Sequence, residues 1–195
     1  TTLNGLSLDS NSVLVGKSPD GVQHPNGDVL NTTDQWKRNG GGEIQVYMKE
    51  AYKNFPYVAY GDGGMDGDYV PKLKEMVTKF NTKYPDLKDD IVWIPFNEPD
   101  ISDANYYNLT NYNSKYDSVR TKFFEDWNKA VEAIRSVYPQ ARIGGPNNSA
   151  YSDRFYRDFF QNAKEHGTVP DVVTWHELGS GFGSYLSNFQ KWKTL

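Results

Sequence analysis

The stretch IVWIPFNEPD, residues 91–100, contains the clearest strand signal in the chain. Its first six residues are apolar, which is typical of a parallel strand that is buried on both faces. The polar run NEPD follows at once, and its proline cannot continue the hydrogen bonding of a strand. Acidic side chains are seldom buried without a partner, so Glu98 at the end of a hydrophobic strand needs an explanation.

Helical patterns lie on both sides of this strand. Before it, apolar residues recur at helical spacing over 68–84, with Asp68 as the expected N-cap and Pro71 in the first turn. The polar residues 101–116 form a loop after it. A second helix, which carries apolar residues between positions 123 and 138, is predicted to stop at Pro139. A third begins at Ser152 or Asp153 and ends at Gly167, and the stretch 184–195 can start one more.

Short strands alternate with these helices. Residues 142–145 and 171–176 are predicted strands, and 57–60 is another, whereas 43–55 fits a strand or a helix. The first 42 residues are rich in turn signals and indicate an irregular segment that can contain a short hairpin. The alternation predicts an α/β domain of parallel strands, either an open doubly wound sheet or a (β/α)8 barrel.

The composition argues against several classes of protein. The chain has 195 residues, the length of one domain or most of one, with 21 Lys and Arg against 25 Asp and Glu. This balance lacks the basic excess of nucleic-acid-binding proteins, and no apolar run approaches the roughly 20 residues of a membrane span. The absence of cysteine excludes disulfides and thiolate chemistry. The surplus of Asn, Tyr, Gly and Asp favours a secreted or cell-surface bacterial protein.

Polar side chains follow three predicted strands where each ends. They are Asn97, Glu98 and Asp100 after the first, Asn147 after the second, and His176 and Glu177 after the third. Ligands of α/β folds bind at the carboxyl ends of parallel strands, so these residues predict one polar pocket. The segment GDGGMDG, 61–67, matches neither nucleotide-binding glycine pattern, and its acidic spacing does not fit a calcium loop. We therefore expect neither a cofactor nor a metal.

The segment FNEPD resembles the Asn-Glu-Pro signature of clan A glycoside hydrolases. Together with RIGGPNNS (142–149) and DVVTWH (171–176), it is similar to family 39, the β-xylosidase and α-L-iduronidase group. This resemblance covers roughly residues 68–179 and implies a (β/α)8 barrel and a retaining glycosidase. It implies that Glu98 is the general acid/base, that Asn97 binds the sugar 2-hydroxyl, and that His176 is a subsite residue. Trp175 beside it offers an aromatic face to a sugar ring.

A retaining mechanism needs a second carboxylate, about 5 to 5.5 Å from the first. The resemblance places it on strand seven, whereas Leu195 lies in the helix after the predicted strand six. A complete barrel takes about 250 residues, so we expect residues 1–195 to form a partial catalytic domain. Two interpretations remain open, a nucleophile beyond Leu195, which we favour, or Glu177. Because neighbours on a strand point to opposite faces, His176 and Glu177 cannot both face inward without a bulge.

Two other functions also remain open. One is a carbohydrate-binding domain that derives from a glycosidase barrel and has lost catalysis. The other is a structural fragment with no activity of its own, whose open sheet edges would favour aggregation.

Overall fold

The computed structural model describes the central and C-terminal parts of the chain and short N-terminal segments. The described residues are 2–3, 7–8, 14–17, 23–24, 33, 37–40, 42–48, 65–101, 108–177 and 182–193. All seven predicted site residues fall within these ranges. The predicted strand over 57–60 lies outside them, as does much of the glycine-rich segment 61–67.

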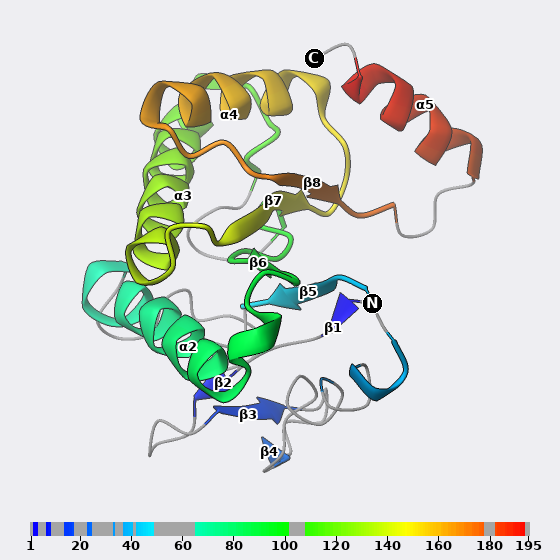
Figure 1. Ribbon diagram of the computed structural model, residues 1–195. Coiled ribbons are helices and arrows are strands. Elements are labelled where there is room, and N and C mark those ends of the chain that lie inside the picture. The colour runs from blue at the N-terminus through cyan, green and yellow to red at the C-terminus, as the bar shows by residue number, and fades with distance from the viewer. Residues whose placement is uncertain are drawn as a thin grey trace.

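The chain forms a parallel sheet of five strands in the order β1-β5-β6-β7-β8 (Figure 1). These strands are β1 (Thr2–Leu3), β5 (Ile44–Tyr47), β6 (Ile91–Ile94), β7 (Arg142–Asn148) and β8 (Val172–Trp175). Each strand pairs in parallel with the next strand in this order, and the spatial order of the strands follows their order along the chain throughout. A doubly wound sheet reverses at a switch point, so this winding is that of a (β/α)8 barrel.

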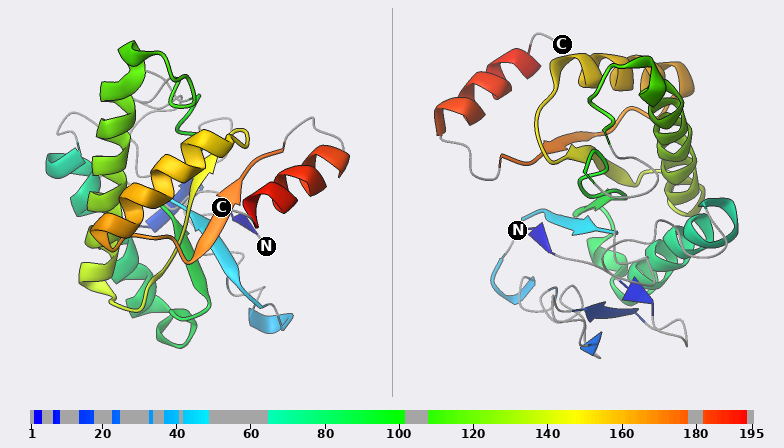
Figure 2. Two further views of the ribbon diagram at one scale, coloured as in Figure 1. Left: turned by 90° about the horizontal axis from the view of Figure 1, so that it is seen from above. Right: turned by 180° about the vertical axis from the view of Figure 1, so that it is seen from behind.

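Three helices cover the same face of the sheet (Figures 1 and 2). They are α2 (Val70–Lys83), α3 (Asp117–Val137) and α4 (Asp153–His166), and each connects two neighbouring strands. A fourth helix, α5 (Phe182–Trp192), follows β8. None of the helices within the described ranges is both long and apolar enough to cross a membrane.

The helix ends follow the sequence signals with one exception. Helix α4 begins after Ser152 and ends at Gly167, whose φ of 69° is the left-handed conformation that glycine adopts easily. Pro71 lies in the first turn of α2 as predicted. The predicted cap at Asp68 is wrong, because a π-helical turn, Met65–Tyr69, precedes α2 and places the N-cap at Tyr69.

The N-terminal part contains more strands than the sequence predicts. Besides β1, it contributes an antiparallel sheet of β2 (Ser7–Leu8), β3 (Leu14–Lys17) and β4 (Gln23–His24). The sequence predicted irregular structure with a possible short hairpin here, and the described residues of this segment form four short strands. Strands β1, β2 and β4 have two residues each, which is too short to produce a periodic pattern, and β1 pairs with the distant β5. The segment 43–55, which contains β5, fits a strand or a helix, so the sequence gave no clear signal there.

The core lies between the sheet and helices α2 to α4 and is rich in aromatic rings. Phe96 packs edge-on against Phe123 of α3, with ring centroids 5.3 Å apart, and Trp127 packs edge-on against Phe159 of α4 at 4.9 Å. The indole of Trp127 also lies against β7, where a Cβ atom on Gly145 would collide with it. The second glycine of the GGP segment is therefore required by packing between α3 and β7.

The sheet curls inward toward the side opposite the helices. Three strand spacings separate β5 from β8, which in a flat sheet amounts to about 14 Å. The ring of Tyr47 on β5 nevertheless lies 6.4 Å from the ring of His176, which directly follows β8. This contact across the inner face brings the ends of four strands around a common space.

Candidate active site

Backbone hydrogen bonds hold the carboxyl ends of β6, β7 and β8 together. The N–H group of Glu98 donates to the carbonyl of Asn147, at 2.9 Å, and the N–H group of His176 donates to the carbonyl of Asn148, at 2.8 Å. Both bonds lie just past the regular strand pairings. They place the polar residues that end each strand next to those of the neighbouring strand.

Glu98 has an unfavourable backbone conformation. Its φ is 47°, in the left-handed region, where a residue with a Cβ atom costs about 1 to 2 kcal/mol. Its side chain is 21 % exposed, and its Oε1 atom lies 2.7 Å from Nδ1 of His176. Glycine or asparagine would suit this backbone better. The local fold therefore does not explain the glutamate, and its carboxylate has to be explained by its contacts.

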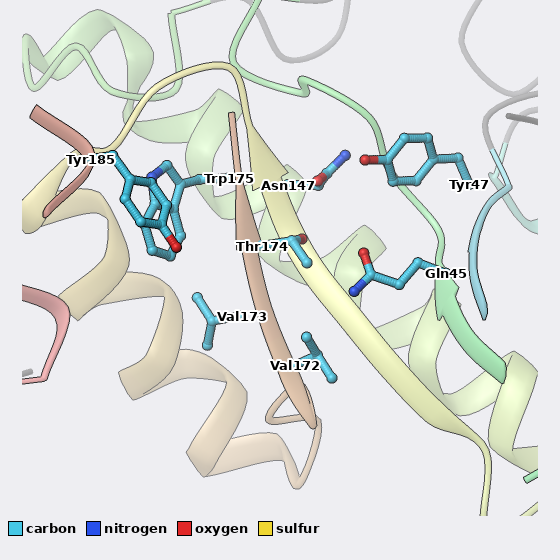
Figure 3. A pocket seen from close by; sticks show the side chains of 8 residues that line it. All are labelled: Gln45, Tyr47, Asn147, Val172, Val173, Thr174, Trp175 and Tyr185. Carbon is cyan, nitrogen blue, oxygen red and sulfur yellow. The ribbon is translucent and has the colours of Figure 1, made fainter. Parts of the chain in front are cut away.

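Asn97 and Asn147 meet beside Glu98. The amide nitrogen of Asn147 donates to the amide oxygen of Asn97, at 3.2 Å. Asn147 also has a positive φ, 66°, which asparagine tolerates, and it lies where the pairing of β7 with β8 is shifted between Pro146 and Asn148. The bulge directs the Asn147 side chain into the space beside Tyr47 (Figure 3).

Asp100 joins two of the strand ends. It is 7 % exposed, and its two carboxylate oxygens accept hydrogen bonds from the backbone N–H group (2.7 Å) and the hydroxyl (2.6 Å) of Ser149. Its carbonyl accepts a further bond from the N–H group of Asn108. These contacts fix the turn after β6 against the end of β7. Direct substrate binding by Asp100 stays a prediction.

Glu177 faces away from the Glu98–His176 pair. Its Oε1 atom accepts hydrogen bonds from the indole of Trp175, at 3.0 Å, and from the side-chain amide of Asn188 on α5, at 2.5 Å. It thus ties the end of β8 to α5. The opposite directions of His176 and Glu177 follow the alternation of side chains along a strand.

A cavity of about 290 Å³ opens beside these residues. Figure 3 shows Gln45 and Tyr47 on one side, Trp175 and Tyr185 on the other, and Asn147 and Thr174 between them. The rings of Trp175 and Tyr185 lie nearly parallel, 6.2 Å apart. Sequence reasoning identified Trp175 and Asn147 but missed Gln45, Tyr47, Thr174 and Tyr185. The alternation of Gln45 and Tyr47 with buried Ile44 and Val46 is the signal that could have revealed the first two.

A buried tyrosine supports the site from the helix layer. Tyr156 of α4 is fully buried and donates a hydrogen bond from its hydroxyl to the carbonyl of Thr174, at 3.2 Å. Burial raises the pKa of Tyr156 well above its ordinary value, and the nearby groups of Asp100, Tyr151 and Glu177 raise it further. Tyr156 therefore stays protonated and acts as a structural donor.

The site combines a carboxylate, an imidazole and two amides at the carboxyl edge of a parallel sheet. Such groups can move a proton and bind hydroxyl groups. Within the parts of the chain that the structure describes, no group of three or more His, Asp or Glu residues is arranged to bind a metal ion.

Two curated proteins are similar in sequence along nearly the whole chain. A 3-O-β-L-arabinopyranosyl-α-L-arabinofuranosidase of Bifidobacterium pseudocatenulatum is 30 % identical over 99 % of the chain. A 3-O-α-D-galactosyl-α-L-arabinofuranosidase of Bifidobacterium longum subsp. longum is 29 % identical over 92 %. The chain spans only 23 % and 19 % of their lengths. No protein-family model matches it.

Solved structures are similar in fold. The structure of N2152 from Neocallimastix frontalis superposes with a TM-score of 0.66 at 20 % identity, over 99 % of this chain and 51 % of that one. A GH39 enzyme from Xanthomonas axonopodis pv. citri gives 0.57 at 12 % identity, over 92 % and 38 %. A psychrophilic glycoside hydrolase family 10 endo-β-1,4-xylanase gives 0.54 at 14 %, over 90 % and 57 %.

In sequence the chain resembles two glycosidases, and in fold it resembles glycoside hydrolases of families 39 and 10. The predicted resemblance to family 39 and the predicted barrel type are both confirmed. The chain spans between about a third and three fifths of these neighbours, as expected of an incomplete glycoside hydrolase barrel.

Proposed function

We propose that the chain is part of a retaining glycoside hydrolase in which Glu98 is the general acid/base. The observation that carries this proposal is the environment of the Glu98 carboxylate. It lies at the carboxyl edge of the barrel sheet, in contact with His176, on a backbone that disfavours glutamate. Residues held in a costly conformation at such an edge are typical of sites where function, and not stability, selects the side chain.

The chemistry assigns Glu98 two successive proton transfers. As the glycosidic bond breaks, the Glu98 carboxyl donates its proton to the departing oxygen while a second carboxylate bonds to the anomeric carbon. In the second step, the Glu98 carboxylate removes a proton from water, whose oxygen displaces the second carboxylate from that carbon. When its Nδ1 carries the proton, His176 donates a hydrogen bond to Glu98 and holds the carboxylate in place. Asn97, beside Asn147, is placed to bind a sugar hydroxyl.

We propose that the second carboxylate comes from outside this chain. The Glu177 carboxylate is held by Trp175 and by Asn188 of α5, and its strand neighbour His176 takes the position that faces Glu98. Glu177 would have to leave both donors and cross to the other side of β8 to act as nucleophile. The remaining strands of the barrel, by analogy with the longer relatives, are the better source.

We further propose that the substrate contains arabinofuranosyl units. Both curated relatives are named as arabinofuranosidases whose arabinofuranose carries a second sugar at O3. A polymeric plant or microbial glycan with such side chains fits the secreted or cell-surface location expected from the composition.

The leaving group gives the sharpest test of the role of Glu98. In Glu98→Gln of the intact protein, kcat/KM for a substrate whose leaving group is a sugar should fall by at least about 100-fold, because the departing oxygen needs protonation. For a 2,4-dinitrophenyl glycoside, whose leaving group needs no proton, bond cleavage should be nearly unaffected, which pre-steady-state release of dinitrophenol would show. Glu177→Gln is the matched control, and it should not separate the two substrates. An equal loss on both substrates in Glu98→Gln would contradict the proposal.

The carbohydrate-binding alternative predicts a different result. A non-catalytic binding domain would hydrolyse neither substrate in the unmodified intact protein. It would still bind arabinose-containing oligosaccharides, with the same affinity in Glu98→Gln.

A further inference from the structure

Two buried tyrosines of the helix layer bond to the carboxyl ends of β6 and β8. Tyr69, the N-cap of α2, donates a hydrogen bond from its hydroxyl to the carbonyl of Pro95, the first residue after β6. Tyr156 of α4 donates in the same way to the carbonyl of Thr174 on β8, at 3.2 Å. Both tyrosines are fully buried. The helix layer thus contacts the proposed catalytic edge of the sheet at two separate points.

The hydroxyl of Tyr69 is not explained by the packing of its ring. Phenylalanine would fill nearly the same volume, and a buried hydroxyl lowers stability unless it makes a hydrogen bond. Pro95 is buried and lies just past the last residue of β6, where the regular pairing of this strand with β5 ends. A buried carbonyl needs a donor. The Tyr69 hydroxyl supplies that donor at the point where the chain leaves the sheet.

A π-helical turn, Met65–Tyr69, brings Tyr69 against this point of the chain. Such turns are rare in proteins and occur frequently at functional sites. The ring of Tyr69 packs against that of Phe96, with centroids 5.9 Å apart, and its hydroxyl bonds to the residue before Phe96. Tyr69 therefore restrains two consecutive residues of the segment 95–98.

The backbone conformation of Glu98 requires such restraints. Its φ of 47° is costly for a residue with a Cβ atom, and a costly conformation persists only where the surrounding contacts determine it. Tyr69 holds the start of the segment 95–98, and the hydrogen bond from the N–H group of Glu98 to the carbonyl of Asn147 holds its end. Loss of the first restraint lets the backbone relax and moves the carboxylate.

Tyr156 acts on His176 by the same route. Its acceptor Thr174 lies two residues before His176, whose own N–H group donates to the carbonyl of Asn148. The end of β8 is thus held between α4 and β7. Because Nδ1 of His176 meets Oε1 of Glu98 at 2.7 Å, a shift of either strand end would lengthen this contact.

We infer that Tyr69 and Tyr156 are positioning residues, which hold Glu98 and His176 at hydrogen-bonding distance. This inference rests on the proposed role of Glu98 as general acid/base and deepens it. Both tyrosines are buried in the helix layer, so they act through the strand ends and not on the substrate. A misplacement of about 1 Å can reduce the rate of an enzyme about 100-fold, so a single buried hydrogen bond can control this proton transfer.

The leaving group distinguishes positioning of Glu98 from a general loss of structure. In the intact protein, Tyr69→Phe and Tyr156→Phe should each lower kcat/KM about 10-fold for a substrate whose leaving group is a sugar, because Glu98 no longer meets the departing oxygen correctly. Pre-steady-state release of dinitrophenol from the 2,4-dinitrophenyl glycoside should be nearly unaffected, because this leaving group needs no proton. Equal losses on both substrates, where Glu98→Gln separates them, would overturn the inference.

Thr168→Val is the matched control. Thr168 is buried before the start of β8, at the end opposite to His176, and its hydroxyl donates to the side-chain amide oxygen of Asn128. The control loses a buried hydroxyl and its hydrogen bond, as the tyrosine variants do, and should lower the melting temperature to a similar extent. It should not separate the two substrates. A separation as large as that of Tyr69→Phe would overturn the inference.

Amide hydrogen exchange tests the two positions independently of catalysis. The N–H group of Glu98 in Tyr69→Phe, and that of His176 in Tyr156→Phe, should exchange at least about 10-fold faster than in the unmodified protein, whereas Thr168→Val should leave both rates unchanged. Unchanged exchange in either tyrosine variant would overturn the assignment of that tyrosine. Faster exchange, combined with equal losses on both substrates in Glu98→Gln, would overturn the proposed function and leave the positioning role supported.

The double variant tests whether the two hydroxyls act on one contact. The losses in melting temperature should add, because Tyr69 and Tyr156 belong to helices on either side of α3 (Figure 1). The losses in kcat/KM should combine to less than their product, because either substitution already disturbs the contact between Glu98 and His176. Losses in kcat/KM that multiply would overturn the joint role of the two tyrosines.

Discussion

The Nδ1 atom of His176 lies 2.7 Å from the Oε1 atom of Glu98, although 78 positions separate the two residues in the chain. The contact forms because β6, β7 and β8 are consecutive parallel neighbours, and their carboxyl ends are linked by hydrogen bonds through Asn147 and Asn148. The barrel sheet therefore brings together an acid and an imidazole from separate βα units.

Because Glu98 has a positive φ, we expect this residue to lower the free energy of unfolding. Glu98→Asn should have a higher free energy of unfolding than Glu98→Gln, by about 0.5 to 1 kcal/mol, because asparagine tolerates a positive φ and glutamine does not. Both variants remove the carboxylate, so their difference isolates the backbone contribution. Urea denaturation followed by tryptophan fluorescence measures it. Equal stability of the two variants would show that the conformation at position 98 carries no strain.

The GGP segment provides a packing prediction. Gly145→Ala should lower the free energy of unfolding by about 1 to 3 kcal/mol, because the added methyl group collides with the indole of Trp127. Gly183→Ala in α5 is the control, since nothing lies within 4 Å of a Cβ atom there, and alanine favours the helix. A melting temperature of Gly145→Ala equal to or higher than that of Gly183→Ala would contradict this account of the GGP segment.

The Asp100–Ser149 link should stabilise the turn that carries Glu98. Asp100→Ala should cost about 1 to 3 kcal/mol, because it leaves the partly buried N–H group of Ser149 without its acceptor. A double-mutant cycle with Ser149→Ala should give a coupling energy of at least 0.5 kcal/mol, as expected for residues in contact. Additive effects would mean that the two side chains do not support each other.

The sequence located the three strand ends that build the site but only part of what surrounds them. Asn97 and Glu98 lie just past β6, which is part of a continuous apolar run, and His176 directly follows β8, so each strand end had a local signal, and the parallel winding brings these residues together. Gln45 and Tyr47 escaped notice because the segment 43–55 fits a strand or a helix, and the register of β5 depends on pairing with β6, 47 positions along the chain. Asp100 shows a further limit, since its partner Ser149 is determined by the turns after β6 and β7, which leave no periodic signal.

A tyrosine on the loop after β6 predicts a dependence of stability on pH. Tyr112 donates a hydrogen bond to Asp158, and the guanidinium groups of Arg120 and Arg154 lie over its ring. Burial raises the pKa of Tyr112, and the hydrogen bond to Asp158 raises it further. Its folded-state pKa is above its unfolded value near 10, so this stabilisation is complete below pH 10 and is lost as the pH rises further.

The test compares Tyr112→Phe with the unmodified chain. Between pH 9 and pH 11, the free energy of unfolding should decline less steeply in the variant, which lacks this titrating hydroxyl. Tyr116→Phe, on the same loop, is the matched control. Parallel pH profiles for Tyr112→Phe and the unmodified chain would show that Tyr112 ionises equally well in the folded and unfolded states.

The most direct test of the central claim is the product that Glu98→Ala of the intact protein forms with azide. Azide needs no general base, and it fits the space left by the carboxyl group beside His176. With an activated arabinofuranoside, we predict faster turnover on addition of azide and a glycosyl azide that keeps the anomeric configuration of the substrate, identified by NMR. A glycosyl azide of inverted configuration would assign Glu98 as the nucleophile, and no acceleration by azide would contradict its role as acid/base.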